Sequence, residues 1–94
     1  MRTLPESWEL VEDGAGLLSE LRAEVGHGHP LYGLALRVVA RSNKSDDLLC
    51  EVLDGSARLA EVHLTWAQHP EPDLQWPAVR FFANERAWQL SAID

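Results

Sequence analysis

Glu61-Val62-His63-Leu64-Thr65-Trp66 is the stretch of this chain that decides the fold. Its side chains alternate in steps of two, which is the period of a strand with one buried face and one accessible face. Val62, Leu64 and Trp66 fall on the apolar side, and His63 falls on the other. The stretch therefore predicts a strand that seats Trp66 in the core and directs the imidazole of His63 outward.

Other segments of the chain also have the pattern of strands. Alternation predicts one strand over residues 34–41, and an apolar run predicts a second over residues 48–53. The third strand, which contains the stretch above, runs from about residue 57 to residue 66, and residues 78–83 predict a fourth. On the first strand, four residues share the predicted apolar face: Leu34, Leu36, Val38 and Ala40.

Asp54-Gly55 is a strong hairpin signal between the second and third strands. A two-residue turn would place residues 49–53 beside residues 58–62. A three-residue turn with Gly55 as a bulge gives the cleaner apolar face, and we prefer it; that face holds Leu48, Cys50, Val52, Ala60, Val62 and Leu64. The opposite face mixes apolar and polar residues, so either a helix covers part of it or it is a contact surface. Its members are Leu49, Glu51, Leu53, Leu59, Glu61 and His63.

Two helices are predicted, one on each side of these strands in the sequence. Apolar residues at helical spacing predict a helix over residues 17–25, with Glu20 and Glu24 facing water and Gly26 as a left-handed stop. Asn84 is a capping residue and predicts a last helix over residues 85–92, with Trp88 facing inward. The fold class is therefore α+β: an antiparallel meander of three to four strands with an N-terminal and a C-terminal helix.

The length of 94 residues predicts one domain over residues 1–94, with a lead-in over 1–13 and a core over 14–94. The composition is 46% apolar and 24% charged, with a net charge of −7. The basic residues form no block, and Lys44 is the single lysine. Binding to nucleic acid or to an anionic membrane needs clustered cations, so we expect neither. A basic protein partner is the natural electrostatic complement.

Cys50 is the only cysteine, so an internal disulfide is excluded, and its position in an apolar run predicts a small buried side chain. The N-terminal residues lack the apolar run of a signal peptide. No apolar run reaches the roughly 20 residues that a membrane span requires. We therefore expect a cytoplasmic protein.

Histidines and acids suggest two kinds of chemistry. His27 and His29, together with Asp46, Asp47 and His63, have the ligand types of a zinc or non-haem iron site, but no tight metal-binding signature is present. We therefore predict no metal and no cofactor. His63 with Asp46 or Asp47 is the candidate acid–base pair. The alternative is a strand histidine that is hydrogen-bonded to a neighbouring group.

The proline-rich loop over residues 67–77 is long for a small domain, and such loops often carry function. It contains Trp76, which is less readily explained by core packing than Trp66 or Trp88. The candidate binding residues are His29, Glu61, His63 and Trp76.

Five motifs stand in order along residues 17–90: His29-Pro30-Leu31-x-Gly33, Ala40-Arg41, Asp46-Asp47-x-Leu49, Ala60-x-Val62-His63-Leu64-Thr65-Trp66 and Trp76-Pro77. Together they resemble a group of small bacterial proteins that have no established activity. Cys50 departs from the pattern, because a bulkier apolar residue is usual there. The resemblance implies a self-contained domain of bacterial origin and implies no chemistry.

These observations predict a non-enzymatic binding or protein-interaction domain that acts through the sheet face around His63 and the loop over residues 67–77. An immunity-like protein that masks a basic partner is one form of this. The alternative is a small metal-dependent or acid–base enzyme that uses His63 with Asp46 or Asp47. A homodimer that pairs through the second sheet face is also possible.

Overall fold

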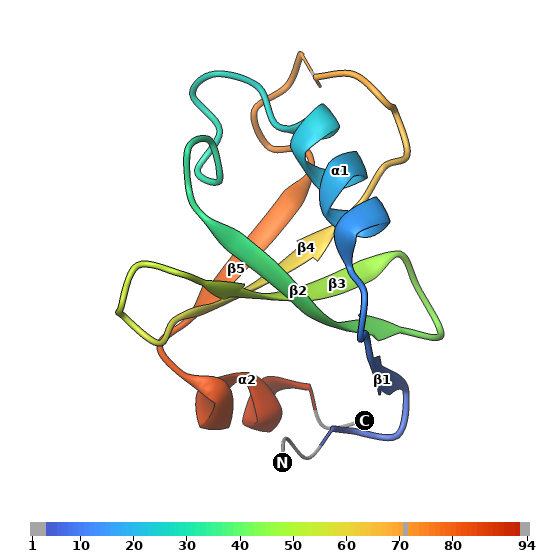
Figure 1. The fold of residues 1–94 in the computed structure, drawn as a ribbon, viewed down its shortest axis with the longest axis vertical. Coiled ribbons are helices and arrows are strands. Elements are labelled where there is room, and N and C mark those ends of the chain that lie inside the picture. The colour runs from blue at the N-terminus through green and yellow to red at the C-terminus, as the bar shows by residue number, and fades with distance from the viewer. Residues whose placement is uncertain (1–3, 71, 93–94) are drawn as a thin grey trace.

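The computed structural model describes residues 4–70 and 72–92. In this part of the chain the elements are β1 (Trp8–Leu10), α1 (Ala15–Glu24), β2 (Leu36–Ser42), β3 (Asp47–Val52), β4 (Leu59–His63), β5 (Ala78–Phe82) and α2 (Glu85–Ser91). The strands form one antiparallel sheet in which each strand lies beside the next one in the sequence (Figure 1). The predicted α+β class and meander are confirmed, but the sheet has five strands rather than three to four.

The strand that the sequence did not predict is β1, which lies within the expected lead-in. It pairs with the end of β2 through Trp8 opposite Ser42 and Leu10 opposite Ala40. Three residues are too few for an alternating pattern to be recognised. What fixes this segment as a strand is its partner β2, which is distant in the sequence.

The core on the α1 side of the sheet has the register that we preferred for the hairpin. Leu48 lies opposite Val62 and Cys50 lies opposite Ala60, and all four are buried together with Leu21 of α1. The prediction of a small buried cysteine is confirmed. Burial raises the pKa of the Cys50 thiol to about 12, so this thiol is protonated at neutral pH.

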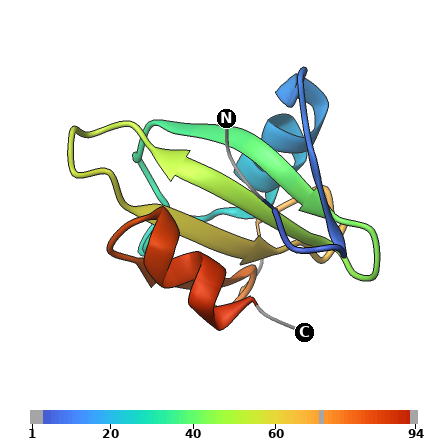
Figure 2. The same ribbon diagram turned by 90° about the horizontal axis from the view of Figure 1, so that it is seen from below.

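The other face of the sheet is covered by α2, as Figure 2 shows. Trp88 of α2 is fully buried against Leu49 and Leu59, and the ring of Trp8 meets it edge-on at 5.1 Å between centroids. The side chain of Asn84 accepts a hydrogen bond from the Ala87 amide, which confirms the predicted cap. Of the two alternatives for this face, the covering helix is the one observed.

Three expectations about individual segments are wrong. A bulge at Val39 shifts the register of β2, so Ala40 packs on the α2 side rather than beside Leu36 and Val38. Helix α1 ends because Val25 is extended, and Gly26 is not the left-handed stop. Strand β4 ends at His63, before Trp66.

Neither described helix has the length and apolar character needed to cross a lipid bilayer.

Candidate functional site

Two long loops lie side by side at one end of the molecule, at the top of Figure 1. They are residues 25–35, between α1 and β2, and the described part of residues 64–77, between β4 and β5. The two loops are in contact, because the side chain of Leu74 packs against Gly28: a Cβ atom added to Gly28 would lie 3.1 Å from Cδ1 of Leu74. Gly28 has a φ of 90°, so a side chain there would also be strained.

These loops display large apolar side chains. We call the exposed group Tyr32, Trp66, Leu74 and Trp76 the two-loop surface; the exposed fractions of these side chains lie between 43% and 50%. The hydroxyl of Tyr32 lies 3.1 Å from Nε2 of His27 on the same loop. Trp66 was expected in the core, and that expectation is wrong. The strand has ended by this point, and a φ of 60° at Trp66 turns the chain out of the alternating pattern.

Glu24, at the end of α1, fixes the backbone that carries Trp66. One carboxylate oxygen of Glu24 accepts from the Thr65 amide and the other accepts from the Trp66 amide, both at 2.8 Å. Glu20, one turn earlier, accepts from the Gln68 amide at 3.2 Å. Glu24 is fully buried, so the expectation that it faces water is wrong. A buried carboxylate with such partners is a fixed point for the loop.

The buried position of Glu24 changes the pKa of its carboxyl group. Burial raises the pKa of Glu24 above its ordinary value, and the nearby side chain of Glu20 acts in the same direction. The hydrogen bonds from the amides of Thr65 and Trp66 oppose these two effects on the pKa without cancelling them.

His29 fixes the other end of the same loop. It is buried, its Nδ1 accepts from the Leu31 amide at 3.0 Å, and its Nε2 lies 2.8 Å from the carbonyl oxygen of Pro77. An amide can only donate and a carbonyl can only accept, so this arrangement places the ring proton on Nε2. Both ring nitrogens are therefore engaged in holding the two loops together, and neither is positioned to bind a metal.

The pair His63 and Asp47 lies at the edge of this region, on the α2 side of the sheet. The two are cross-strand partners, and Nδ1 of His63 lies 2.9 Å from Oδ1 of Asp47. The ring of His63 also lies 6.5 Å from the ring of Trp76, between centroids. The hydroxyl of Ser45 donates to the second oxygen of Asp47 at 2.6 Å. In a nucleophilic triad the hydroxyl would donate to the histidine, so this order leaves Ser45 without an activating base.

The candidate metal ligands do not form a site. His27 contacts Tyr32, His29 holds Pro77, and His63 pairs with Asp47. Asp46 contributes its backbone carbonyl, which accepts from the Leu64 amide at 3.0 Å. Among the residues that the structure describes, no group of three or more His, Cys, Asp or Glu side chains is arranged to hold a metal ion.

Glu61 holds α2 onto the sheet. One of its carboxylate oxygens accepts from the indole nitrogen of Trp88 and the other accepts from Arg80, each at 2.9 Å. Of the four candidate binding residues, only His63 and Trp76 therefore lie beside each other on an accessible surface. Glu61 and His29 instead hold other parts of the fold in place.

Sequence reasoning missed the role of Glu24, although a signal for it was present. Glu24 follows Leu17 by seven residues and Leu21 by three, so it lies on the apolar face of the helix. A carboxylate on that face must find hydrogen-bond donors, and the chain after β4 provides them.

Comparisons with protein-family models, with curated proteins and with solved structures found no match to this chain.

Proposed function

We propose that this protein is a non-enzymatic protein-interaction domain that binds a basic partner protein through the two-loop surface. Masking of a basic partner in the manner of an immunity protein is one form of this function. The proposal shifts the contact surface from the second sheet face, which α2 covers, to the loops beside His63 and Trp76.

The observation that carries the proposal is that the buried carboxylate of Glu24 accepts from the backbone amide of Trp66, whose indole is exposed. Removing a carboxylate from water is unfavourable. In this protein the buried carboxylate holds the backbone of a loop in place through its hydrogen bonds. The left-handed φ values of Trp66 and Gln68 are a further local strain. A large aromatic side chain on a fixed backbone loses little freedom on binding, and tryptophan is enriched among the residues that dominate interface energies.

The charge of the protein supports a basic partner. The net charge is −7, and the exposed acidic side chain of Asp73 lies on the loop that displays Trp66, Leu74 and Trp76. Arginine and lysine side chains stack favourably on the face of tryptophan. A partner that presents such cations would gain both from this stacking and from long-range attraction.

Affinity capture from cells of the source organism tests this proposal. The wild-type protein, the double variant Trp66→Ser/Trp76→Ser and the control Leu90→Ser, which changes an exposed leucine on α2, would be used as baits. We expect a basic protein to bind the wild type and the control, to be lost with the double variant, and to dissociate as salt is raised. Capture that is unchanged by the double variant, or only of acidic proteins, would contradict the proposal. Unfolding curves for each bait establish that the variants are folded.

The His63–Asp47 pair favours a second candidate function, a small acid–base enzyme. A carboxylate on Nδ1 leaves Nε2 of the neutral ring as the proton acceptor. Under this candidate, hydrolysis of an activated ester such as p-nitrophenyl acetate would fall to the background rate in both His63→Ala and Asp47→Asn. Equal rates for the wild type and His63→Ala would eliminate it.

We further propose a bacterial host and a cytoplasmic location. The resemblance of the five motifs to small bacterial proteins supports the bacterial host. The single cysteine cannot form an internal disulfide, which is compatible with a reducing compartment. Fractionation of the source cells with an antibody to the chain would test the location.

A further inference from the structure

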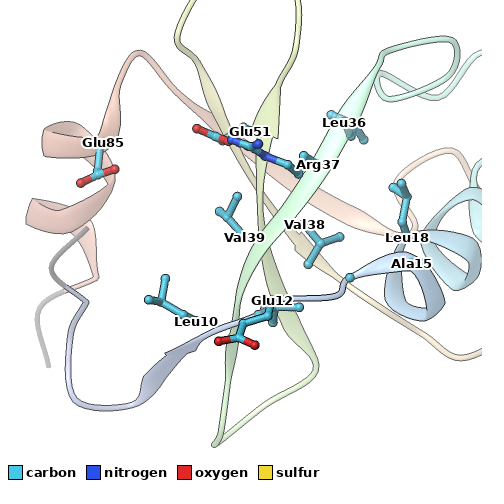
Figure 3. Close-up of a pocket in the computed structure, with 12 residues that line it drawn as sticks. Leu10, Glu12, Ala15, Leu18, Leu36, Arg37, Val38, Val39, Glu51 and Glu85 are labelled. Atoms are coloured by element: carbon cyan, nitrogen blue, oxygen red, sulfur yellow. Dashed lines mark hydrogen bonds and ion pairs between the residues drawn. The ribbon is translucent and has the colours of Figure 1, made fainter. Parts of the chain in front are cut away.

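A groove of about 700 Å³ lies beside β2, between helix α2 and the segment that follows β1 (Figure 3). It shares no residue with the two-loop surface. On the α2 side of the sheet its floor is apolar, because the half-buried Val39 and the exposed Leu10 both line it. Binding sites for small molecules commonly have a volume of this order and combine apolar lining with a few polar groups.

Three carboxylates line the groove at separate points around this apolar floor. In Figure 3, Glu85 of α2 lies beyond Val39 on one side of the floor. Glu12 lies beside Leu10 on another side, and Glu51 of β3 lies on a third. The carboxylates therefore surround the apolar side chains and do not converge on a single point.

The charges that line the groove do not cancel. Three glutamates, Glu12, Glu51 and Glu85, line it together with one arginine, Arg37, which gives a net charge of −2. Arg37 forms an ion pair with Glu51, so these two side chains together carry no net charge. Glu12 is exposed, and no other described residue forms a hydrogen bond or ion pair with its side chain. A ligand with two positive charges would therefore match the lining.

The separation of the carboxylates selects the form of this ligand. A metal ion needs several ligands around one point, and the described residues provide no such group. A linear aliphatic diamine instead has its two ammonium groups at the ends of a methylene chain. The chain can lie on the apolar floor while each ammonium group donates hydrogen bonds to a carboxylate at the side of the groove.

We propose that this groove binds a linear aliphatic diamine whose two ammonium groups lie at Glu12 and Glu85. Its methylene chain lies on Leu10 and Val39, and the internal ion pair of the groove stays intact. This inference goes beyond the proposed function, because the ligand is a small molecule and the groove is separate from the two-loop surface.

Nuclear magnetic resonance titration of the full isotope-labelled chain with amines tests the inference. The probes are the linear diamines from diaminopropane to diaminooctane, together with the monoamine whose chain is as long as that of the best diamine. We expect the methyl signals of Leu10 and Val39 to shift, and the affinity to be highest at one chain length. The monoamine should bind about fivefold more weakly than this diamine, because it lacks the second charge.

Matched variants separate binding in this groove from general attraction to an acidic protein. Glu12→Gln and Glu85→Gln should each weaken binding of the best diamine about threefold, and Asp73→Asn, the same change of charge outside the groove, should leave it unchanged. An affinity that does not depend on chain length, an equal effect of Asp73→Asn, or no shift at Leu10 and Val39 would overturn the inference. A capped lysine–lysine dipeptide that binds as tightly as the best diamine would also overturn it, because the groove would then suit a protein partner. None of these outcomes bears on capture through Trp66 and Trp76, so the proposed function is tested separately.

Discussion

Glu24 lies on the same face of α1 as Leu17 and Leu21, and the helix therefore carries its carboxylate into the interior. There it accepts the amides of Thr65 and Trp66, at the point where the chain leaves the sheet. The alternation over residues 61–66 suggested that Trp66 is buried, but the hydrogen bonds to Glu24 stop the strand pattern before that residue. One polar residue on a helix thus determines that a tryptophan forty-two residues later is exposed.

Replacing Glu24 should destabilise the protein more than replacing Glu20, which lies one turn earlier on the same helix. Glu24→Ala leaves two amides without their acceptor, and we expect a loss of about 2 kcal/mol in the free energy of unfolding. Glu20→Ala removes one longer bond at a more accessible site, and we expect a loss of less than about 1 kcal/mol. Chemical denaturation measures both values. Equal losses for the two variants would contradict the assigned role of Glu24.

The raised pKa of Glu24 predicts a pH dependence of stability. The folded state favours the protonated form, so this contribution is fully present below the ordinary pKa of 4.5 and is lost as pH rises through the raised pKa. Glu24→Gln cannot ionise and lacks this dependence. Relative to this variant, the stability of the wild type should therefore fall as pH rises above 4.5 and then level off. Urea unfolding of both proteins between about pH 4 and 8 measures the difference, and a flat or rising difference would refute the prediction.

At the scale of elements, contacts between segments that are distant in the sequence determine which residues form strands and which face of the sheet a residue occupies, where the local sequence pattern does not. β1 is a strand because β2 offers it an edge, and the bulge at Val39 places Ala40 on the face that α2 covers. The connection from β1 into α1 passes close to β2, because a Cβ atom added to Gly14 would lie 2.8 Å from Cβ of Val38. Only glycine fits this approach without a shift of the backbone.

Two glycines near the start of α1 should therefore respond to alanine in opposite ways. Gly14→Ala forces the connection away from Val38 and should lower the free energy of unfolding by about 1–2 kcal/mol. Gly16 lies inside α1 with nothing within 4 Å of an added Cβ atom. Gly16→Ala should stabilise the protein by about 0.5–1 kcal/mol, because alanine favours the helix. Thermal unfolding distinguishes the two outcomes, and a stabilising Gly14→Ala would show that the close approach is wrong.

The packing of helix α2 on the sheet should depend mainly on the side chain of Trp88. Trp88→Ala removes the ring that packs on Leu49, Leu59 and Trp8, and we expect it to lower the free energy of unfolding by about 3–5 kcal/mol. Leu90 on the same helix is 63% exposed, and Leu90→Ala should change stability by less than about 0.5 kcal/mol. Denaturant titration measures both changes. A small effect of Trp88→Ala would mean that α2 does not cover the sheet.

At the scale of the whole molecule, the two-loop surface remains accessible after the core is formed. On the second sheet face, α2 of the same chain covers Leu49 and Leu59, whereas Leu53 stays exposed.

The sequence could predict the α+β class, the β3–β4 register and the Asn84 cap, because alternation and capping are local properties. It could also indicate His63 and Trp76, since a strand histidine and a tryptophan in a long loop are both unusual. It could not reveal the burial of Glu24, the exposure of Trp66 or the pairing of β1 with β2, because each depends on where a distant segment lies.

Amide hydrogen exchange at Thr65 and Trp66 tests most directly whether the two-loop surface is preformed on a fixed backbone. If Glu24 holds these amides, they should exchange at least about tenfold more slowly than the exposed amide of Gln75, which is bound to Asp73 in the same loop. This protection should disappear in Glu24→Ala. Exchange at Thr65 and Trp66 as fast as at Gln75 in the wild type would contradict the central claim, because Trp66 would then be carried by a mobile loop.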